Sequence, residues 1–107
     1  AAELGRRGLP TRTLLCANDR IALGAQLAAW EAGIRVGRGP GDDLRIAGHD
    51  DHPQARFACP PLTTVAQNYA EMARLATTEL LDRIDEDPGS PPSSTLLRAE
   101  LRLRASA

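Results

Sequence analysis

The sequence predicts an α/β protein with a mostly parallel sheet flanked by helices, and three observations lead to that fold class. Short apolar runs alternate with longer stretches of helical periodicity, in the order strand, helix, strand, strand, helix, strand. The strongest period-two pattern lies near the end, where alternate residues of Leu97–Arg104 are apolar. Glycine and proline gather between these segments, at Val36–Asp43 and Asp50–Pro61. Such alternation favours parallel strands joined by right-handed crossovers.

The first half of the chain holds one expected strand and one expected helix. Thr11–Ala17 is a short apolar run typical of a buried strand. A helix follows over about Asp19–Ala32, because Asn18 is a good N-cap and Gly33 is a natural residue to end it. Ala1–Gly8, before the strand, resembles the tail of a helix.

The second half holds two short expected strands, a longer helix and the final strand. Leu44–Gly48 and Leu62–Val65 are the strands. Asn68, with Glu71 three residues later, is a capping-box-like start for a helix that runs to about Glu86. The last strand, over Leu97–Arg104, is expected to have one apolar and one wet face.

Length and composition exclude several classes of protein. With 107 residues the chain suits one domain with a modest core. A net charge of -1 excludes a strongly basic DNA-binding surface over the whole chain. No apolar run is long enough for a membrane span, and no signal-peptide pattern opens the sequence. Two cysteines make no disulfide framework, which favours a reducing cytoplasm.

The helix over Asp19–Ala32 has two apolar faces, although a surface helix needs only one. The large face carries Leu23, Leu27, Trp30 and, just beyond the helix, Ile34. The small face carries Ile21, Ala25, Ala28 and Ala32. We expect the small face to pack on the sheet and the large face to form a partner interface, with cover by a neighbouring loop as the alternative.

The helix that starts at Asn68 has a single apolar stripe, which predicts an ordinary core-facing helix. The stripe consists of Tyr69, Met72, Ala73, Ala76, Leu80 and Ile84.

Polar clusters follow the first three expected strands. They are Asn18–Asp19, His49–His52 and Gln67–Asn68. Parallel strands would bring all three to one edge of the sheet, where open α/β sheets bind ligands. Amide and carboxylate groups suit the hydroxyls of a sugar or nucleoside better than a phosphate. Each cluster alone has a simpler explanation as a helix cap or turn.

Other chemistry has weaker support in the sequence. His49 and His52 flank two aspartates, but their spacing matches no helix-borne zinc motif, so we expect no metal. Cys16 lies in an apolar strand, where a buried, inert thiol is expected, and Cys16 and Cys59 do not suggest a nucleophile. The sequence holds no nucleophile elbow, Walker sequence or dinucleotide fingerprint. We therefore expect no catalytic residue and no cofactor.

Four segments in order carry a family resemblance. They are CANDRIALGA (Cys16–Ala25), EAGIRVG (Glu31–Gly37), LRIAGHDD (Leu44–Asp51) and PPLTTVAQ (Pro60–Gln67). Together they resemble the effector-binding region of LacI/GalR-type bacterial transcriptional repressors, over about Thr11–Arg104. The resemblance implies a type I periplasmic-binding-protein-like fold, in which the effector lies between two α/β subdomains. Residues 1–107 would form the C-terminal part, without the helix-turn-helix and most of the N-terminal subdomain.

The resemblance also implies roles for particular residues. Asn18, Asp50 and Gln67 match positions that contact the effector, and His49 and Tyr69 match positions that line the cleft. Leu23, Leu27 and Trp30 match the dimer surface of the family. The helix from Asn68 would belong to the N-terminal subdomain.

These expectations combine into a cytoplasmic, homodimeric regulator that a small ligand, a sugar or a nucleoside, controls allosterically. DNA would be contacted only through the missing N-terminal domain, and no membrane is involved. The alternative is a sugar-binding protein of a transport or chemoreceptor system with the same fold. An enzyme comes third.

Overall fold

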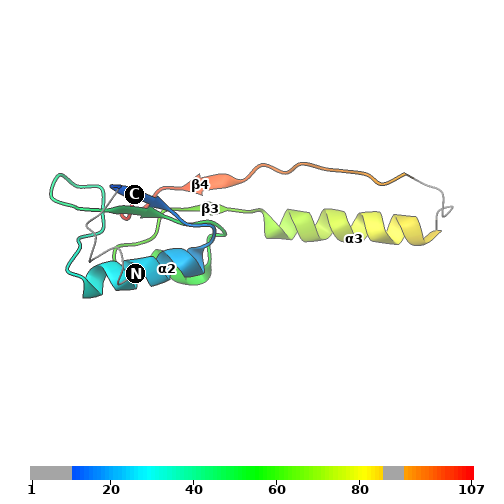
Figure 1. Ribbon diagram of the computed structural model, residues 1–107. Coiled ribbons are helices and arrows are strands. Elements are labelled where there is room, and N and C mark those ends of the chain that lie inside the picture. The colour runs from blue at the N-terminus through cyan, green and yellow to red at the C-terminus, as the bar shows by residue number, and fades with distance from the viewer. Residues whose placement is uncertain (1–10, 86–90) are drawn as a thin grey trace. The chain divides into compact units, whose positions relative to one another are not determined.

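The computed structural model describes residues 11–85 and 91–107 (Figure 1). The elements are β1 (Thr13–Leu15), α2 (Asp19–Glu31), β2 (Arg45–Ala47), the 3-10 helix η1 (Pro53–Phe57), β3 (Thr64–Ala66), α3 (Tyr69–Asp85) and β4 (Glu100–Arg102). The predicted order of strands and helices is confirmed. The helix tail expected over Ala1–Gly8 lies outside the described residues.

The chain divides into two compact units. The first contains the chain up to Ala66 together with Glu100–Ala107, and the second spans Gln67–Ala99. The four strands of the described residues and α2 belong to the first unit, whereas α3 belongs to the second.

The strands of the first unit are mostly parallel, as predicted. β1 pairs with β2 in parallel, with Leu14 opposite Ile46. Parallel bridges Ala47–Thr63 and Asp50–Ala66 join the end of β2 to β3. β4 runs antiparallel to β3, with Val65 opposite Leu101. Three strands therefore point the same way, and their carboxyl ends share one edge.

Helix α2 begins and ends as its sequence predicts. The Oδ1 atom of Asn18 accepts a hydrogen bond from the N–H of Ile21 at 2.9 Å, which caps the first turn. Gly33 follows the helix with a φ of 70°, a conformation that glycine adopts without steric penalty.

The face of α2 that packs on the sheet is not the predicted one. Its buried residues are Asp19, Ala22, Gln26 and Ala29. Ile21, from the predicted inward face, is 55% exposed. The buried stripe runs between the two apolar lines, because Gln26 donates a hydrogen bond from Nε2 to the carbonyl of Pro60 at 3.0 Å and can therefore be buried. The hydrogen-bonded amide of Gln26 is therefore buried where small apolar residues were expected.

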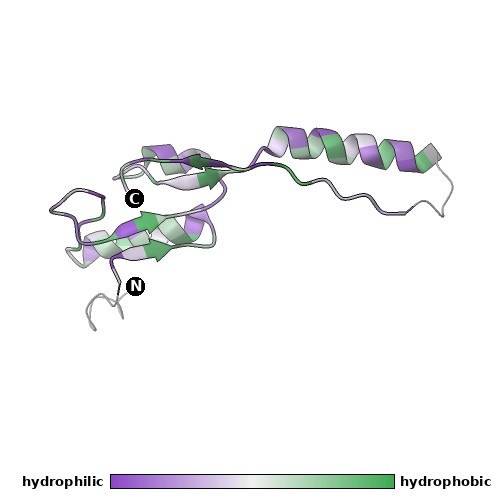
Figure 2. Cartoon of the chain, turned by 90° about the horizontal axis from the view of Figure 1, so that it is seen from above, coloured by the Kyte–Doolittle hydropathy of each residue, from purple (hydrophilic) through white to green (hydrophobic). Residues whose placement is uncertain are grey.

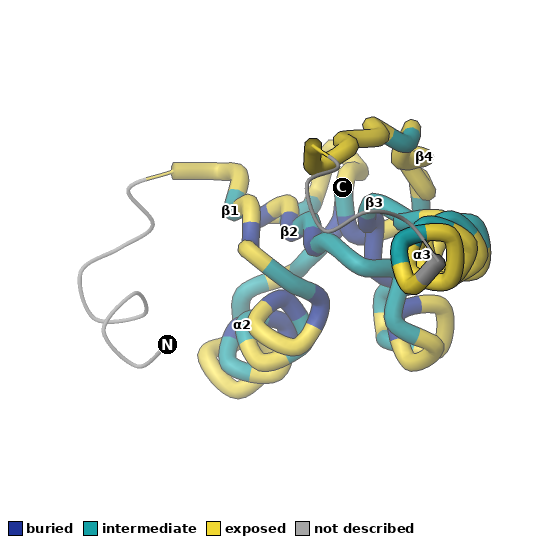
Figure 3. Tube along the Cα trace, turned by 90° about the vertical axis from the view of Figure 1, so that its right-hand side faces the viewer, coloured by how far each residue is buried: buried dark blue, intermediate teal, exposed yellow. Residues whose placement is uncertain are grey.

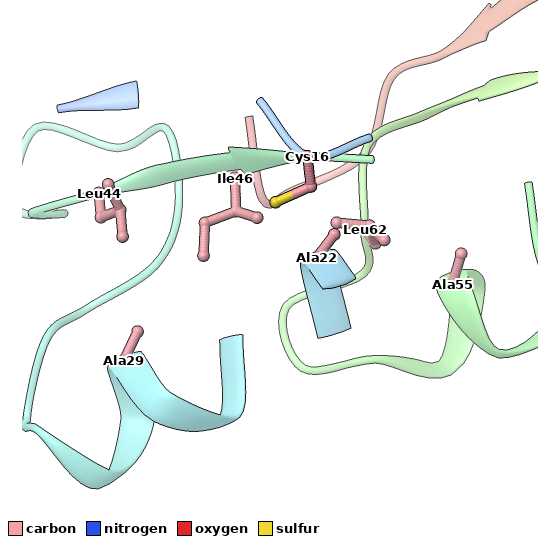
Figure 4. Close-up of a cluster of buried hydrophobic side chains, with 7 residues drawn as sticks. All are labelled: Cys16, Ala22, Ala29, Leu44, Ile46, Ala55 and Leu62. Carbon is pink, nitrogen blue, oxygen red and sulfur yellow. The ribbon is translucent and has the colours of Figure 1, made fainter. Parts of the chain in front are cut away.

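A small apolar core lies between α2 and the sheet. It consists of Cys16, Ala22, Ala29, Leu44, Ile46, Ala55 and Leu62. In Figure 4 the side chains of Leu44, just before β2, and of Ile46, on β2, point toward α2, and Ala29 points back from the helix. The alanines allow α2 to approach the strand closely, since they add little bulk at the contact.

The C-terminal segment completes this unit. Ser106 is fully buried, and its Oγ atom donates to the carbonyl of Ile46 at 2.6 Å and accepts from the N–H of Thr63 at 2.8 Å. The N–H of Ile46 in turn donates to the carbonyl of Ser106 at 2.9 Å. Ser106 therefore ties the C-terminal segment to β2 and to the residue just before β3, both of which are distant from it in sequence.

The last strand is shorter than predicted and lacks a buried apolar face. Leu101 is 61% and Leu103 65% exposed. The segment is held instead by backbone pairing with β3 and by the polar contacts of Arg104 and Ser106.

In the second unit, α3 is capped as predicted, with Asn68 Oδ1 accepting from the N–H of Glu71 at 3.1 Å. Its predicted core stripe is not buried: Tyr69, Met72, Leu80 and Ile84 are exposed. Figure 2 shows apolar residues interspersed along α3, and Figure 3 shows no fully buried position on it. Within the described part of this unit, only the extended segment before β4 is available to pack on the helix.

That segment contacts a different side of α3. Glu79 accepts hydrogen bonds from Ser93 Oγ and from Arg83 Nε, both at 2.7 Å, which hold the pKa of its carboxyl below the ordinary value. A shallow cavity of about 270 Å³ lies beside this contact, between Leu75 on the helix and Leu97 on the segment. Leu75, which lies off the predicted stripe, is thus more buried than the stripe itself.

Candidate functional site

Backbone hydrogen bonds align the ends of β1, β2 and β3 at one edge of the sheet. The N–H of Asp19 donates to the carbonyl of His49 at 2.9 Å, so the start of α2 lies beside the residues that follow β2. The N–H of Asp50 donates to the carbonyl of Val65 at 2.8 Å, so the same residues lie beside the end of β3. The structure therefore brings two of the three predicted polar clusters together.

Asn18 is half-buried at this edge and caps α2 through its amide oxygen. An amide group also has two N–H donors on nitrogen. Among the described residues, the helix cap uses only the amide oxygen of Asn18, so its amide nitrogen can donate hydrogen bonds to a ligand. Capping and ligand binding are compatible in this side chain.

His49 and Asp50 form a hydrogen-bonded pair directly after β2. Their Nδ1 and Oδ1 atoms are 3.1 Å apart, and both side chains are half-buried. The pair offers a carboxylate and an imidazole at the partly wet edge of the sheet. Such groups can accept from and donate to hydroxyls.

The turn that carries Asp50 has an uncommon backbone. Asp50 has a φ of 115° and Asp51 a φ of 53°, both in the region that residues other than glycine rarely adopt. Each such residue costs on the order of 1–3 kcal/mol and persists only when its surroundings hold it in place. Contacts on both sides of the turn provide that support.

On one side, Asp51 is held by the C-terminal segment. Its Oδ1 atom accepts from Arg104 Nη2 at 2.7 Å, and Arg104 Nη1 donates to the carbonyl of Leu62 at 2.8 Å. Arg102 Nε lies 3.9 Å from the other oxygen of Asp51. Asp51 therefore stabilises the turn, in keeping with the simpler explanation of this polar cluster as a turn.

On the other side lies Asp19, which the sequence groups with Asn18 among the polar residues expected at the ligand-binding edge, but which is buried beneath that edge. Its side chain is buried, with Oδ2 accepting from the N–H of His52 at 2.7 Å and Oδ1 accepting from Thr64 Oγ1 at 2.5 Å. Sequence alone placed Asp19 in the first turn of a helix, where an acidic residue needs no further explanation. Only the sheet register joins it to residues 33 and 45 positions away.

Gln67 and Tyr69 belong to the second unit. Gln67 is the next residue after Ala66, whose bridge partner is Asp50. Tyr69 is the first residue of α3. Their part in ligand binding stays a prediction.

The three predicted dimer residues differ in exposure. Leu27 and Trp30 are exposed, at 57% and 77%. Leu23 is half-buried and packs against the core, so the expectation that it faces away from the sheet is wrong. It lies closer to the buried stripe, beside Ala22 and Gln26.

The two thiols have different surroundings. Cys16 is buried, as predicted, and burial raises the pKa of its thiol because the thiolate would lose solvation. Cys59 is exposed, and both cysteines are free.

Two kinds of feature are absent from the described residues. No group of three or more His, Cys, Asp and Glu side chains there could hold a metal ion. No described helix is long and apolar enough to cross a bilayer.

Comparison with known proteins adds the family. The periplasmic binding protein-like domain matches residues 1–107. The HTH-type transcriptional repressor PurR of Haemophilus influenzae is 41% identical over 105 residues, which are 96% of this chain and 30% of that protein. The regulator MalR of Streptomyces coelicolor is 36% identical, over 99% of this chain and 29% of its own length. The chain thus spans about 30% of the length of these relatives.

Solved structures agree in fold. A LacI family regulator from Lactobacillus casei with bound sucrose superposes with a TM-score of 0.79 at 32% identity, covering 98% of this chain and 37% of that one. The lac repressor dimer bound to operator and the anti-inducer ONPF gives 0.81 at 30% identity, over 97% and 34%. These relatives are transcriptional regulators rather than enzymes. The chain belongs to the periplasmic binding protein-like domain family, in the form found in LacI-type transcriptional regulators.

Proposed function

We propose that this chain is the effector-sensing and dimerising part of a cytoplasmic LacI-type transcriptional regulator. One observation carries the proposal: Asn18, His49 and Asp50 lie at the carboxyl ends of neighbouring parallel strands, where open α/β sheets bind ligands. Residues 1–107 would be the C-terminal part of the ligand-binding domain. The division of the chain at Gln67 supports assigning α3 to the other subdomain.

The effector would be a small hydroxyl-rich molecule, a sugar or a nucleoside. The half-buried amide of Asn18 and the His49–Asp50 pair supply donors and acceptors suited to hydroxyl groups. By the family resemblance, Gln67 and Tyr69 would also contact the ligand. The Lactobacillus casei regulator is described with bound sucrose and also with bound glucose, which supports the sugar class.

Control would be allosteric. A ligand that binds one arrangement of the two subdomains more tightly shifts the population toward it. Two copies would meet through α2, and DNA would be contacted through a segment outside this chain. The lac repressor described above is a dimer bound to operator, which supports this arrangement.

The test is a binding screen on the complete gene product with sucrose, glucose, ribose, adenosine and guanosine, read as a rise in Tm. Asp50→Ala should weaken binding of the stabilising compound by about 1–3 kcal/mol, since it removes a carboxylate acceptor from bound hydroxyls. Asp43→Ala is the matched control, because it removes an exposed aspartate from the loop before β2. Equal affinity in wild type and Asp50→Ala would refute the assignment of this site.

A further inference from the structure

We propose that Asp19 is a positioning residue for the effector site: its buried carboxylate fixes the turn at Asp50–His52 and thereby sets where the Asp50 carboxylate lies. This inference rests on the proposed function, because it takes Asp50 as a ligand-binding group. Asp19 itself is buried and would not touch the ligand.

The contacts of Asp19 converge on that turn. One oxygen accepts from the N–H of His52, two residues beyond Asp50. The other accepts from Thr64 Oγ1, and the same hydroxyl oxygen accepts from the N–H of Asp51 at 3.3 Å. Two paths therefore run from Asp19 to the turn, one direct and one through Thr64. The backbone N–H of Asp19 adds a third contact, to the carbonyl of His49.

The turn needs such support because it is strained. Two successive residues other than glycine adopt positive φ, and the relaxed conformation of each is elsewhere. Without the Asp19 bond, the N–H of His52 loses its acceptor and the backbone is free to relax. Relaxation would rotate the Asp50 side chain, since a change of φ moves every atom beyond it.

The packing around Asp19 shows that its place is specific. Gly48 lies against it, and a Cβ at Gly48 would collide with the Asp19 carboxylate and lie 3.1 Å from its Cα atom. The Asp19 side chain is therefore packed between the end of β2, the turn and the start of α2. Arg104 holds the turn at Asp51 independently, so loss of Asp19 should loosen the turn without unfolding the unit.

The test compares Asp19→Ala with Ser106→Ala in the complete gene product. Ser106 is also buried and also bridges two strands by hydrogen bonds, but these bonds reach Ile46 and Thr63 instead of the turn. Amide hydrogen exchange should speed up at Asp50 and His52 in Asp19→Ala and at Thr63 in Ser106→Ala. This readout needs no ligand.

Affinity is measured with whichever of sucrose, glucose, ribose, adenosine and guanosine raises the Tm of the wild type. Asp19→Ala should raise Kd about tenfold and Ser106→Ala less than about twofold, because only the first moves Asp50. Thr64→Val, which removes one of the two paths, should fall between them. Asp19→Asn should fall between wild type and Asp19→Ala, because its one amide oxygen can still accept from the N–H of His52 whereas the buried Thr64 hydroxyl loses its acceptor.

Two results would overturn the positioning role: unchanged exchange at Asp50 and His52 in Asp19→Ala, or an equal loss of affinity in Ser106→Ala. Failure of every compound to stabilise the wild type would instead count against the proposed ligand class. In that case the exchange rates still decide whether Asp19 holds the turn.

Discussion

The absence of a side chain at Gly48 allows the start of α2 to approach the end of β2. A methyl group there would meet the carboxylate of Asp19 and lie 3.2 Å from the methyl of Ala22. Both neighbours are fully buried, so neither can move away freely. The closeness of helix and strand at this point therefore depends on the absence of a side chain.

Gly48→Ala should lower the free energy of unfolding by about 1–3 kcal/mol, because it overpacks a closed contact. Gly24→Ala is the matched control: Gly24 lies in α2 with open space around it, and alanine there should stabilise the helix by up to about 1 kcal/mol. Urea unfolding of the complete gene product measures both. Equal effects of the two substitutions would contradict the close contact at Gly48.

The two thiols should differ in how readily they are alkylated. The pKa of Cys16 is raised by burial, so its thiolate is scarcer at any given pH below that value, and its reaction with iodoacetamide should be slow. Cys59 is exposed and should be alkylated first at pH 8. Peptide mass spectrometry over time distinguishes the two. Faster labelling of Cys16 would mean that the segment just after β1 opens readily.

Sequence patterns identified the site residues that follow strands, but not the residues that hold them. Asn18 and Asp50 were found because cap and strand-end positions are local in sequence. The structural roles of Asp19 and Ser106 do not follow from the sequence, because their partners lie between 33 and 60 positions away. A buried polar residue is defined by such distant partners, and no local pattern contains them.

At the scale of elements, α2 presents Leu27 and Trp30 to solvent, which suits the proposed dimer contact. Leu27→Arg should convert a dimer of the complete gene product to monomers, since an arginine would lie opposite its own copy in a two-fold contact. Sedimentation measures the mass.

Ile21→Arg is the control, because Ile21 is equally exposed on another side of the same helix. Leu23 is less suitable as a test site, since it packs against the core and an arginine there would disturb the fold. A dimer that persists in Leu27→Arg, or that Ile21→Arg dissociates equally, would show that another surface mediates association.

Periodicity predicted which elements form but not which faces they bury. In α2 the buried stripe includes an amide that hydropathy counts as polar. In α3 the apolar stripe is exposed. An apolar stripe indicates which face of a helix favours burial, but it does not show which element packs against that face. Element boundaries and caps depend on local chemistry, which explains why they were predicted to within a few residues.

At the scale of the whole molecule, the second unit exposes a long apolar surface. Tyr69, Met72, Leu80 and Ile84 together form a surface of the kind that soluble proteins rarely leave open. Residues 1–107 prepared alone should therefore self-associate through α3, and Leu80→Glu with Ile84→Glu should reduce the average mass in sedimentation. Glutamates at Thr77 and Thr78 are the control, since they add the same charge at exposed polar positions. A monomeric wild-type chain would contradict this expectation.

The sheet of the first unit is assembled from distant parts of the chain, and this affects the order of folding. Thr63 and Ile46 obtain their Ser106 partners only after the second unit has been synthesised between them. Chains grow from the N-terminus at roughly 5–20 residues per second, so this sheet waits seconds for its final segment. Because closing such long loops is entropically slow, the first unit should complete folding late. During that interval the growing chain is exposed to aggregation and to proteases, so the rate of translation contributes to its yield in the cell.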